Sequence, residues 1–233
     1  MALAQTEPKK IYIWVEWWKP WANTLAYWTL DNTLVDETWN YNLTQGSWTF
    51  VQLSSWRYVL SLDATVSANW AYYNWWPDLR NKDLTWNVWC RDTAGRSGYN
   101  WWSYINLKGS SNIIISITHA WPSQSNKIYA AFGTLNNFSV APTYNDTYWH
   151  NIVFTYKYSD KTLKQYVDNV LKATSTVGDL PSATTETYLW YYTTWYGNDV
   201  HLQVWASIIE SKERTTQEIS DYYDQTKWDY WIS

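Results

Sequence analysis

The chain has 233 residues and a net charge of −4, and apolar side chains make up 46% of it, which is enough to bury a core. This length suits one sandwich or barrel, or two small domains. Basic residues are spread along the chain, so it lacks the clustered lysines and arginines of a nucleic-acid-binding surface. No apolar run approaches the roughly 18 residues of a transmembrane helix, and no secretory signal is visible, so we expect no membrane insertion.

Strand patterns dominate the chain. Short β-branched and aromatic runs alternate with Asn, Asp, Ser, Gly and Pro, a spacing typical of an all-β sandwich or barrel. We expect an N-terminal lead-in segment over residues 1–22 and a single all-β domain over 23–233. The predicted strands cover 10–15, 25–30, 41–53, 56–62, 84–91, 99–107, 112–119, 127–132, 150–158, 163–173, 187–192 and 200–209.

The clearest local element is a hairpin. The strand pattern of 151–156 runs into a turn at 158–161 and returns through 163–167. Asp168 and Asn169 then predict a second tight turn, because Asn and Asp tolerate positive φ and suit a type I′ loop.

One short helix is expected near the C-terminus. Thr215 and Glu218 are three residues apart and fit a capping box. Ile219, Tyr222 and Tyr223 then share one helical face, which predicts a short helix that docks on the sandwich.

Residues that would support catalysis are sparse. No strand carries alternating acidic residues, and Glu210 and Glu213 lie where the last strand gives way to the helix, which argues against a glycoside hydrolase. The lone Cys90 excludes an intrachain disulfide and is expected to be a buried, unreactive thiol. We predict that the chain is not an enzyme. Three histidines lack zinc-hydrolase spacing and are expected at strand ends or on the surface: His119, His150 and His201.

Acidic and amide side chains cluster in residues 31–42. Hard oxygen donors on a loop suit Ca²⁺, and the predicted ligands are Asp31, Asp36 and Asn40. An ordinary solvated loop with Asx-turns is the alternative interpretation of the same residues.

Two aromatic segments, 71–78 and 191–199, have the composition of a sugar-binding site. A flat ring can stack on the apolar face of a pyranose while neighbouring polar groups hydrogen-bond its hydroxyls. Aromatic packing in the core is the alternative. The predicted ligand-binding residues are Tyr72, Tyr73, Asn74, Asp78, Tyr191, Tyr192 and Asn198.

Three segments resemble laminin-G-like members of the concanavalin-A-like lectin/glucanase superfamily. They are the hairpin at 149–156 and 163–171, the final strand and helix at 208–222, and the N-terminal motif at 26–40. The resemblance implies a jelly-roll sandwich of two antiparallel sheets. Members of this family mostly bind glycans or proteins, often with Ca²⁺ at the rim, and a minority are hydrolases.

Tryptophan and glycine are present in unusual numbers, with 22 Trp and 7 Gly. Where the family has glycine, this chain has Trp39 and Asn169. Either these sites hold Trp with altered turns, or some are glycines whose UGA codons, read as Gly in a few bacterial lineages and their viruses, are translated here as Trp. Trp89 and Trp149 fall where the family uses Trp and are expected as core anchors. Other Trp residues where turns or strand ends would favour glycine are Trp17, Trp18, Trp21, Trp70, Trp75, Trp76, Trp101, Trp102, Trp190 and Trp205.

These observations together predict a non-catalytic carbohydrate- or surface-protein-binding module, extracellular or on a cell or virion surface. The alternative is a structural or adhesion module of a virion or cell surface, since residues 10–20 loosely resemble lead-in segments of phage surface proteins. The expected partners are a glycan or a surface protein, with homo-oligomer or virion assembly as a further expectation, and the expected cofactor is one Ca²⁺.

Overall fold

The computed structural model describes residues 22–43, 49–54, 57–63, 71–73, 79–93, 100–108, 112–119, 127–131, 138–142, 147–179, 186–192 and 201–227. The predicted lead-in therefore lies outside the described residues, apart from Ala22. In these ranges the chain forms β1 (Thr24–Trp28), β2 (Thr49–Ser54), β3 (Arg57–Asp63), β4 (Ala71–Tyr73), β5 (Leu84–Asp92), β6 (Asn100–Lys108), β7 (Asn112–His119), β8 (Lys127–Ala131), β9 (Phe138–Pro142), β10 (His150–Lys157), β11 (Thr162–Val167), β12 (Val170–Thr176), β13 (Glu186–Tyr192), β14 (His201–Glu210) and α1 (Thr216–Thr226).

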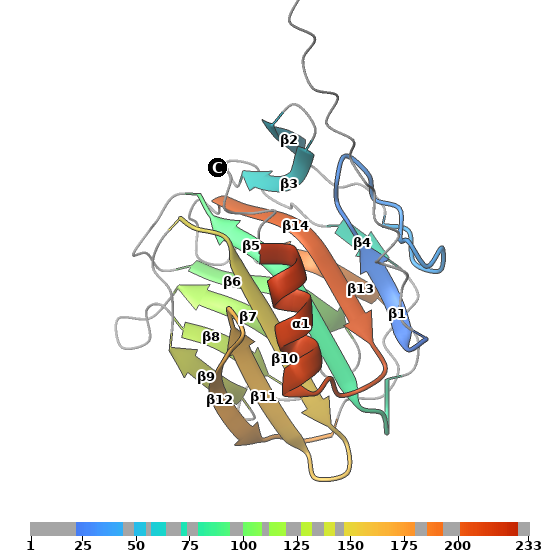
Figure 1. The fold of residues 1–233 in the computed structure, drawn as a ribbon, viewed down its shortest axis with the longest axis vertical. Helices are drawn as coiled ribbons and strands as arrows, with labels where there is room; N and C mark the ends of the chain where they lie inside the picture. Colours follow the sequence, from blue (N-terminus) through green and yellow to red (C-terminus); the bar gives the residue numbers. More distant parts are fainter. Residues whose placement is uncertain are drawn as a thin grey trace, which may run out of the picture.

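The strands form two antiparallel sheets (Figure 1). The first, sheet A, has the order β12-β11-β10-β5-β14-β3-β2, with β1 also paired to β14. The second, sheet B, has the order β4-β13-β6-β7-β8-β9. The predicted all-β jelly-roll sandwich with one short C-terminal helix is confirmed. In the described part of the chain, no helix is long and apolar enough to cross a membrane.

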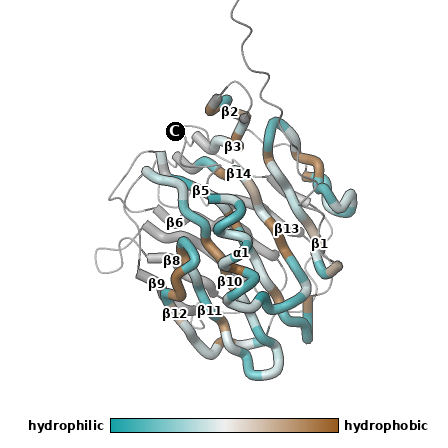
Figure 2. The backbone as a smooth tube through the Cα atoms, viewed as in Figure 1, coloured by the Kyte–Doolittle hydropathy of each residue, from teal (hydrophilic) through white to brown (hydrophobic). Residues whose placement is uncertain are grey.

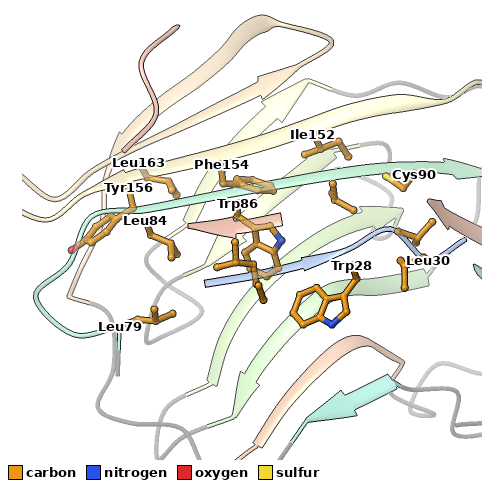
Figure 3. Packing of buried hydrophobic residues seen from close by; sticks show 14 of the residues in the cluster. Trp28, Leu30, Leu79, Leu84, Trp86, Cys90, Ile152, Phe154, Tyr156 and Leu163 are labelled. Carbon is orange, nitrogen blue, oxygen red and sulfur yellow. The ribbon is translucent and has the colours of Figure 1, made fainter. Parts of the chain in front are cut away.

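The main core lies on the inner face of sheet A. Side chains of a strand alternate between faces, so β5 turns Trp86 and Cys90 inward and β10 turns Ile152 and Phe154 inward. Figure 3 shows Trp86 lying close to Phe154 and Trp28. Burying each large apolar side chain contributes about 1.5–3 kcal/mol. The predicted burial of Cys90 is confirmed.

Helix α1 covers the outer face of sheet A. Its capping box is formed as predicted, because the Thr215 hydroxyl accepts from the Glu218 N–H and the Glu218 carboxylate accepts from the Thr215 N–H. Ile219 of the helix packs beside Val153 and Tyr166 of the sheet. In Figure 2 much of α1 is hydrophilic, whereas hydrophobic stretches lie in the strands around it.

Trp89 anchors this helix to the sheet. Its side chain is 2% exposed, its ring stacks on Tyr223 with centroids 5.7 Å apart, and its indole N–H donates to Thr226 Oγ1 over 3.1 Å. Its predicted role as a core anchor is confirmed. Trp149, the residue before β10, is half-buried and packs against the same cluster.

The structure also contains strands that the sequence patterns did not predict. β4 and β9 were missed, and the pattern at 163–173 is two strands, β11 and β12, joined by the predicted tight turn. Asp168 and Asn169 have φ values of 50° and 63°, as a type I′ turn requires.

Candidate functional site

The two predicted aromatic segments lie on neighbouring strands. β4 is the edge strand of sheet B and pairs with β13, so Tyr72 lies opposite Tyr188 and Tyr73 lies opposite Thr187. Pairing of β13 with β6 sets Tyr191 opposite Ser103 and Tyr192 opposite Trp102. The structure therefore brings four predicted residues into one strand pair. Three others lie outside the described residues: Asn74, Asp78 and Asn198.

The register of β4 and β13 sets the spacing of these residues. Tyr192 follows Tyr188 by four positions along β13, which corresponds to about 14 Å in an extended strand. Because the pair is antiparallel, β4 ends at Tyr73 beside the start of β13, away from Tyr192. The tyrosine positions thus form an elongated strip along β4 and β13 rather than one cluster, and successive positions alternate between the two faces of the sheet.

Tyr188 is a residue that the sequence analysis did not select. It belongs to a predicted strand, but its position opposite Tyr72 depends on β4. A strand of three residues is too short to show an alternating pattern, so the sequence carried no signal for this pairing.

Asp36 organises the loop that was predicted to bind calcium. Its side chain is fully buried, and its carboxylate accepts hydrogen bonds from the N–H groups of Tyr27 at 2.8 Å, Thr38 at 3.0 Å and Tyr41 at 2.9 Å. It also accepts from the Asn40 N–H at 3.2 Å and from the Thr38 hydroxyl. A buried carboxylate with this many donors fixes the path of the surrounding backbone.

The other two predicted calcium ligands have different surroundings. Asp31 accepts a hydrogen bond of 2.7 Å from the Tyr58 N–H of β3, while the Asn40 amide donates to Thr38 Oγ1 over 3.2 Å. In the described ranges, no three His, Cys, Asp or Glu side chains are grouped so as to hold a metal ion. The calcium site stays a prediction, and the hydrogen bonds to Asp36 give the carboxylate a structural role as well.

Both positions that the family resemblance marked as glycine have left-handed backbone. Trp39 and Asn169 each have φ of 63°, and the Trp39 side chain is 76% exposed. Positive φ is rare for a bulky residue and ordinary for glycine, so the backbone at position 39 favours the glycine interpretation. Trp205, by contrast, has no positive φ and falls at a bulge between Val204 and Ala206.

The remaining suspect tryptophans divide by location. Trp101 and Trp102 lie in β6, and Trp190 lies in β13. The rest lie outside the described residues: Trp17, Trp18, Trp21, Trp70, Trp75 and Trp76.

Glu210, the carboxylate at the junction of strand and helix, is enclosed beneath α1. It is fully buried and forms an ion pair with the Arg214 guanidinium. The backbone N–H of Arg214 donates to Thr85 Oγ1 over 2.8 Å. Burial raises the pKa of Glu210, and the charge of Arg214 opposes that shift. A carboxylate held in this way fastens the helix to the sheet and is shielded from a substrate.

The histidines lie at strand ends, as expected. His119 ends β7, His201 begins β14, and His150 begins β10. His150 is buried, and its Nδ1 lies 2.6 Å from Asp168 Oδ2, so it joins the strand to the tight turn.

No known protein family and no curated protein matches this chain. Solved structures do share its fold, among them receptor-binding domains of botulinum neurotoxins. The binding domain of neurotoxin DC in complex with rat synaptotagmin II superposes with a TM-score of 0.64 at 13% identity, covering 87% of this chain and 52% of that chain. The same domain in complex with SialylT gives 0.64 at 13%, covering 88% and 52%. The serotype C1 binding domain gives 0.64 at 15%, covering 87% and 52%.

This chain spans about half the length of the solved structures it matches. Its neighbours are binding domains with a β-sandwich fold, and at these identities the likeness concerns the fold.

Proposed function

We propose that this domain is a non-catalytic binding module of the laminin-G/concanavalin-A-like type, which recognises a glycan through the β4–β13 edge of sheet B. The observation that carries the proposal is the pairing of β4 with β13. It sets Tyr72 directly opposite Tyr188, and Tyr191 and Tyr192 follow further along β13.

The arrangement suits a chain of sugars. Aromatic rings stack on pyranose faces, while tyrosine hydroxyls hydrogen-bond the sugar hydroxyls. A strip that extends from Tyr72 to Tyr192 would contact several linked rings rather than one. Asn74, Asp78 and Asn198 would supply further polar groups.

The structural neighbours support a binding role. The neurotoxin DC binding domain has been solved both with SialylT and with rat synaptotagmin II, and cell entry of botulinum neurotoxin type C is dependent upon interaction with two ganglioside molecules. By analogy, this chain would act at a cell or virion surface or in the extracellular space, with a glycan or a glycan-bearing protein as its partner.

A glycan array, probed with and without EDTA, tests the proposal. Tyr72→Ala and Tyr188→Ala should each weaken binding of the best glycan by about tenfold, as expected from loss of one stacking contact. The matched control is Tyr158→Ala, which removes a tyrosine at the β10–β11 turn of sheet A and should leave affinity unchanged.

Each outcome of the array is informative. Binding that EDTA abolishes would support the calcium prediction for Asp31, Asp36 and Asn40, and binding that resists EDTA would argue against it. No binding under either condition would contradict the glycan proposal. It would favour the alternative, a structural or adhesion module that takes part in virion or homo-oligomer assembly.

A further inference from the structure

A row of three side chains, one of them a cation, lies on the outer face of sheet A. Gln203 of β14 lies opposite Arg91 of β5, and the ring of Trp149, the residue before β10, lies against Arg91. The guanidinium carbon of Arg91 is 5.0 Å from the centre of the Trp149 ring, and Arg91 Nε donates to Gln203 Oε1 over 2.9 Å. This face is opposite to the one that turns Cys90 into the core.

The row lies just beyond the end of α1. Trp89, two residues before Arg91 on the same face, is covered by Tyr223 and Thr226, and the helix ends at Thr226. Arg91 itself is half-buried.

Arg91 lacks a carboxylate partner among the residues that the structure describes. Two carboxylates on neighbouring elements are paired elsewhere, Asp168 with His150 and Asp224 with Lys227. The polar contact of Arg91 is with the neutral Gln203 amide, and desolvation by burial lowers its pKa. A half-buried charge without a counter-ion is unfavourable, and a bound anion would compensate it.

We propose that Arg91, held by Trp149 and Gln203, binds the carboxylate of an acidic sugar. Gln203 occupies Nε and the indole supports one face of the guanidinium, so the two Nη groups remain to bind a carboxylate in a bidentate geometry. The choice of a sugar as the carrier of the carboxylate rests on the proposed function. The site itself is separate, since it lies on sheet A rather than at the β4–β13 edge.

The probe is 3′-sialyllactose, with lactose as its uncharged counterpart, and the measurement is the Kd of each by titration at one ionic strength. The unmodified chain should bind sialyllactose about tenfold more tightly than lactose, as a charge-assisted bidentate pair allows. Arg91→Gln should abolish this preference. Lys172→Gln, which removes the same charge from an exposed position on β12, should preserve it.

Two further variants test the geometry and the location of the site. Arg91→Lys retains the charge and the fold but not the bidentate geometry, so it should reduce the preference while leaving thermal stability unchanged. Tyr72→Ala should leave the Kd of 3′-sialyllactose unchanged, which separates this site from the β4–β13 edge. Equal Kd values for the two sugars, a preference that survives Arg91→Gln, or competition by acetate as strong as by sialyllactose would overturn the proposal.

Discussion

The loop at Trp39 and the tight turn at Asn169 have the same left-handed backbone conformation but carry different side chains. Both residues have φ of 63°. Asn169 suits this conformation, because asparagine tolerates the left-handed region, and its amide also donates to Ser220 Oγ over 2.8 Å. Trp39 has a bulky side chain that is 76% exposed, and its backbone N–H donates to the Asp36 carbonyl oxygen over 2.7 Å.

The contrast separates a position where the side chain suits the backbone conformation from one where it does not. At position 169 local preference and fold agree, as expected of a natural sequence, whereas at position 39 they conflict. The glycine interpretation removes the conflict and accounts for the excess of 22 Trp over 7 Gly. A UGA codon at position 39, or a glycine in the peptide mass of the natural protein, would support it. A UGG codon there would refute it.

The largest expected effect concerns a tryptophan that the fold requires. Trp89→Gly should lower the free energy of unfolding by about 3–5 kcal/mol, because it leaves a cavity beneath Tyr223 and removes the bond to Thr226. Urea denaturation measures this. A neutral result would mean that Trp89 is as replaceable as Trp39, and the distinction between the two would fail.

Asp36→Ala should have the next largest effect. It leaves several part-buried N–H donors of the 27–41 loop without their acceptor, at a cost of about 1–3 kcal/mol. The same denaturation experiment, run with and without calcium, is the measurement. A loss that appears only with calcium present would show that the metal, rather than the hydrogen bonds, organises the loop.

Trp39→Gly should stabilise the protein. Relief of positive φ is worth about 1–2 kcal/mol for a bulky residue, and the added flexibility of glycine in the unfolded chain offsets about half of it. The midpoint of thermal unfolding should therefore rise by a few degrees. A fall in the midpoint would mean that the exposed indole makes contacts that outweigh the strain.

Asn169→Gly should have the smallest effect, within about 0.5 kcal/mol, since the gain in backbone freedom at positive φ balances the lost bond to Ser220. The difference between the two glycine variants in free energy of unfolding is the quantity to measure. If Asn169→Gly stabilised as much as Trp39→Gly, the backbone at position 39 would not distinguish tryptophan from asparagine.

Local signals in the sequence predicted much of the fold. The capping box at Thr215 and Glu218 and the turn at Asp168 and Asn169 were predictable because each depends on neighbouring residues. Most strand positions followed from alternation and turn residues for the same reason.

The candidate sites were predicted only in part because they depend on pairing between distant segments. β4 is too short to show a pattern, so the sequence could not place Tyr72 opposite Tyr188. The row of Arg91, Trp149 and Gln203 exists only through the register of three strands. At Asp36, a calcium ligand and a loop-organising carboxylate require the same oxygens, so the residue type alone could not separate them.

Mapping a bound neutral glycan by backbone amide shifts in NMR tests the central claim most directly. The account predicts that the shifts on titration gather on β4 and the adjoining part of β13, from Tyr72 and Tyr188 toward Tyr192. Shifts confined to α1, to the loop around Asp36 or to the β10–β12 side of sheet A would contradict it.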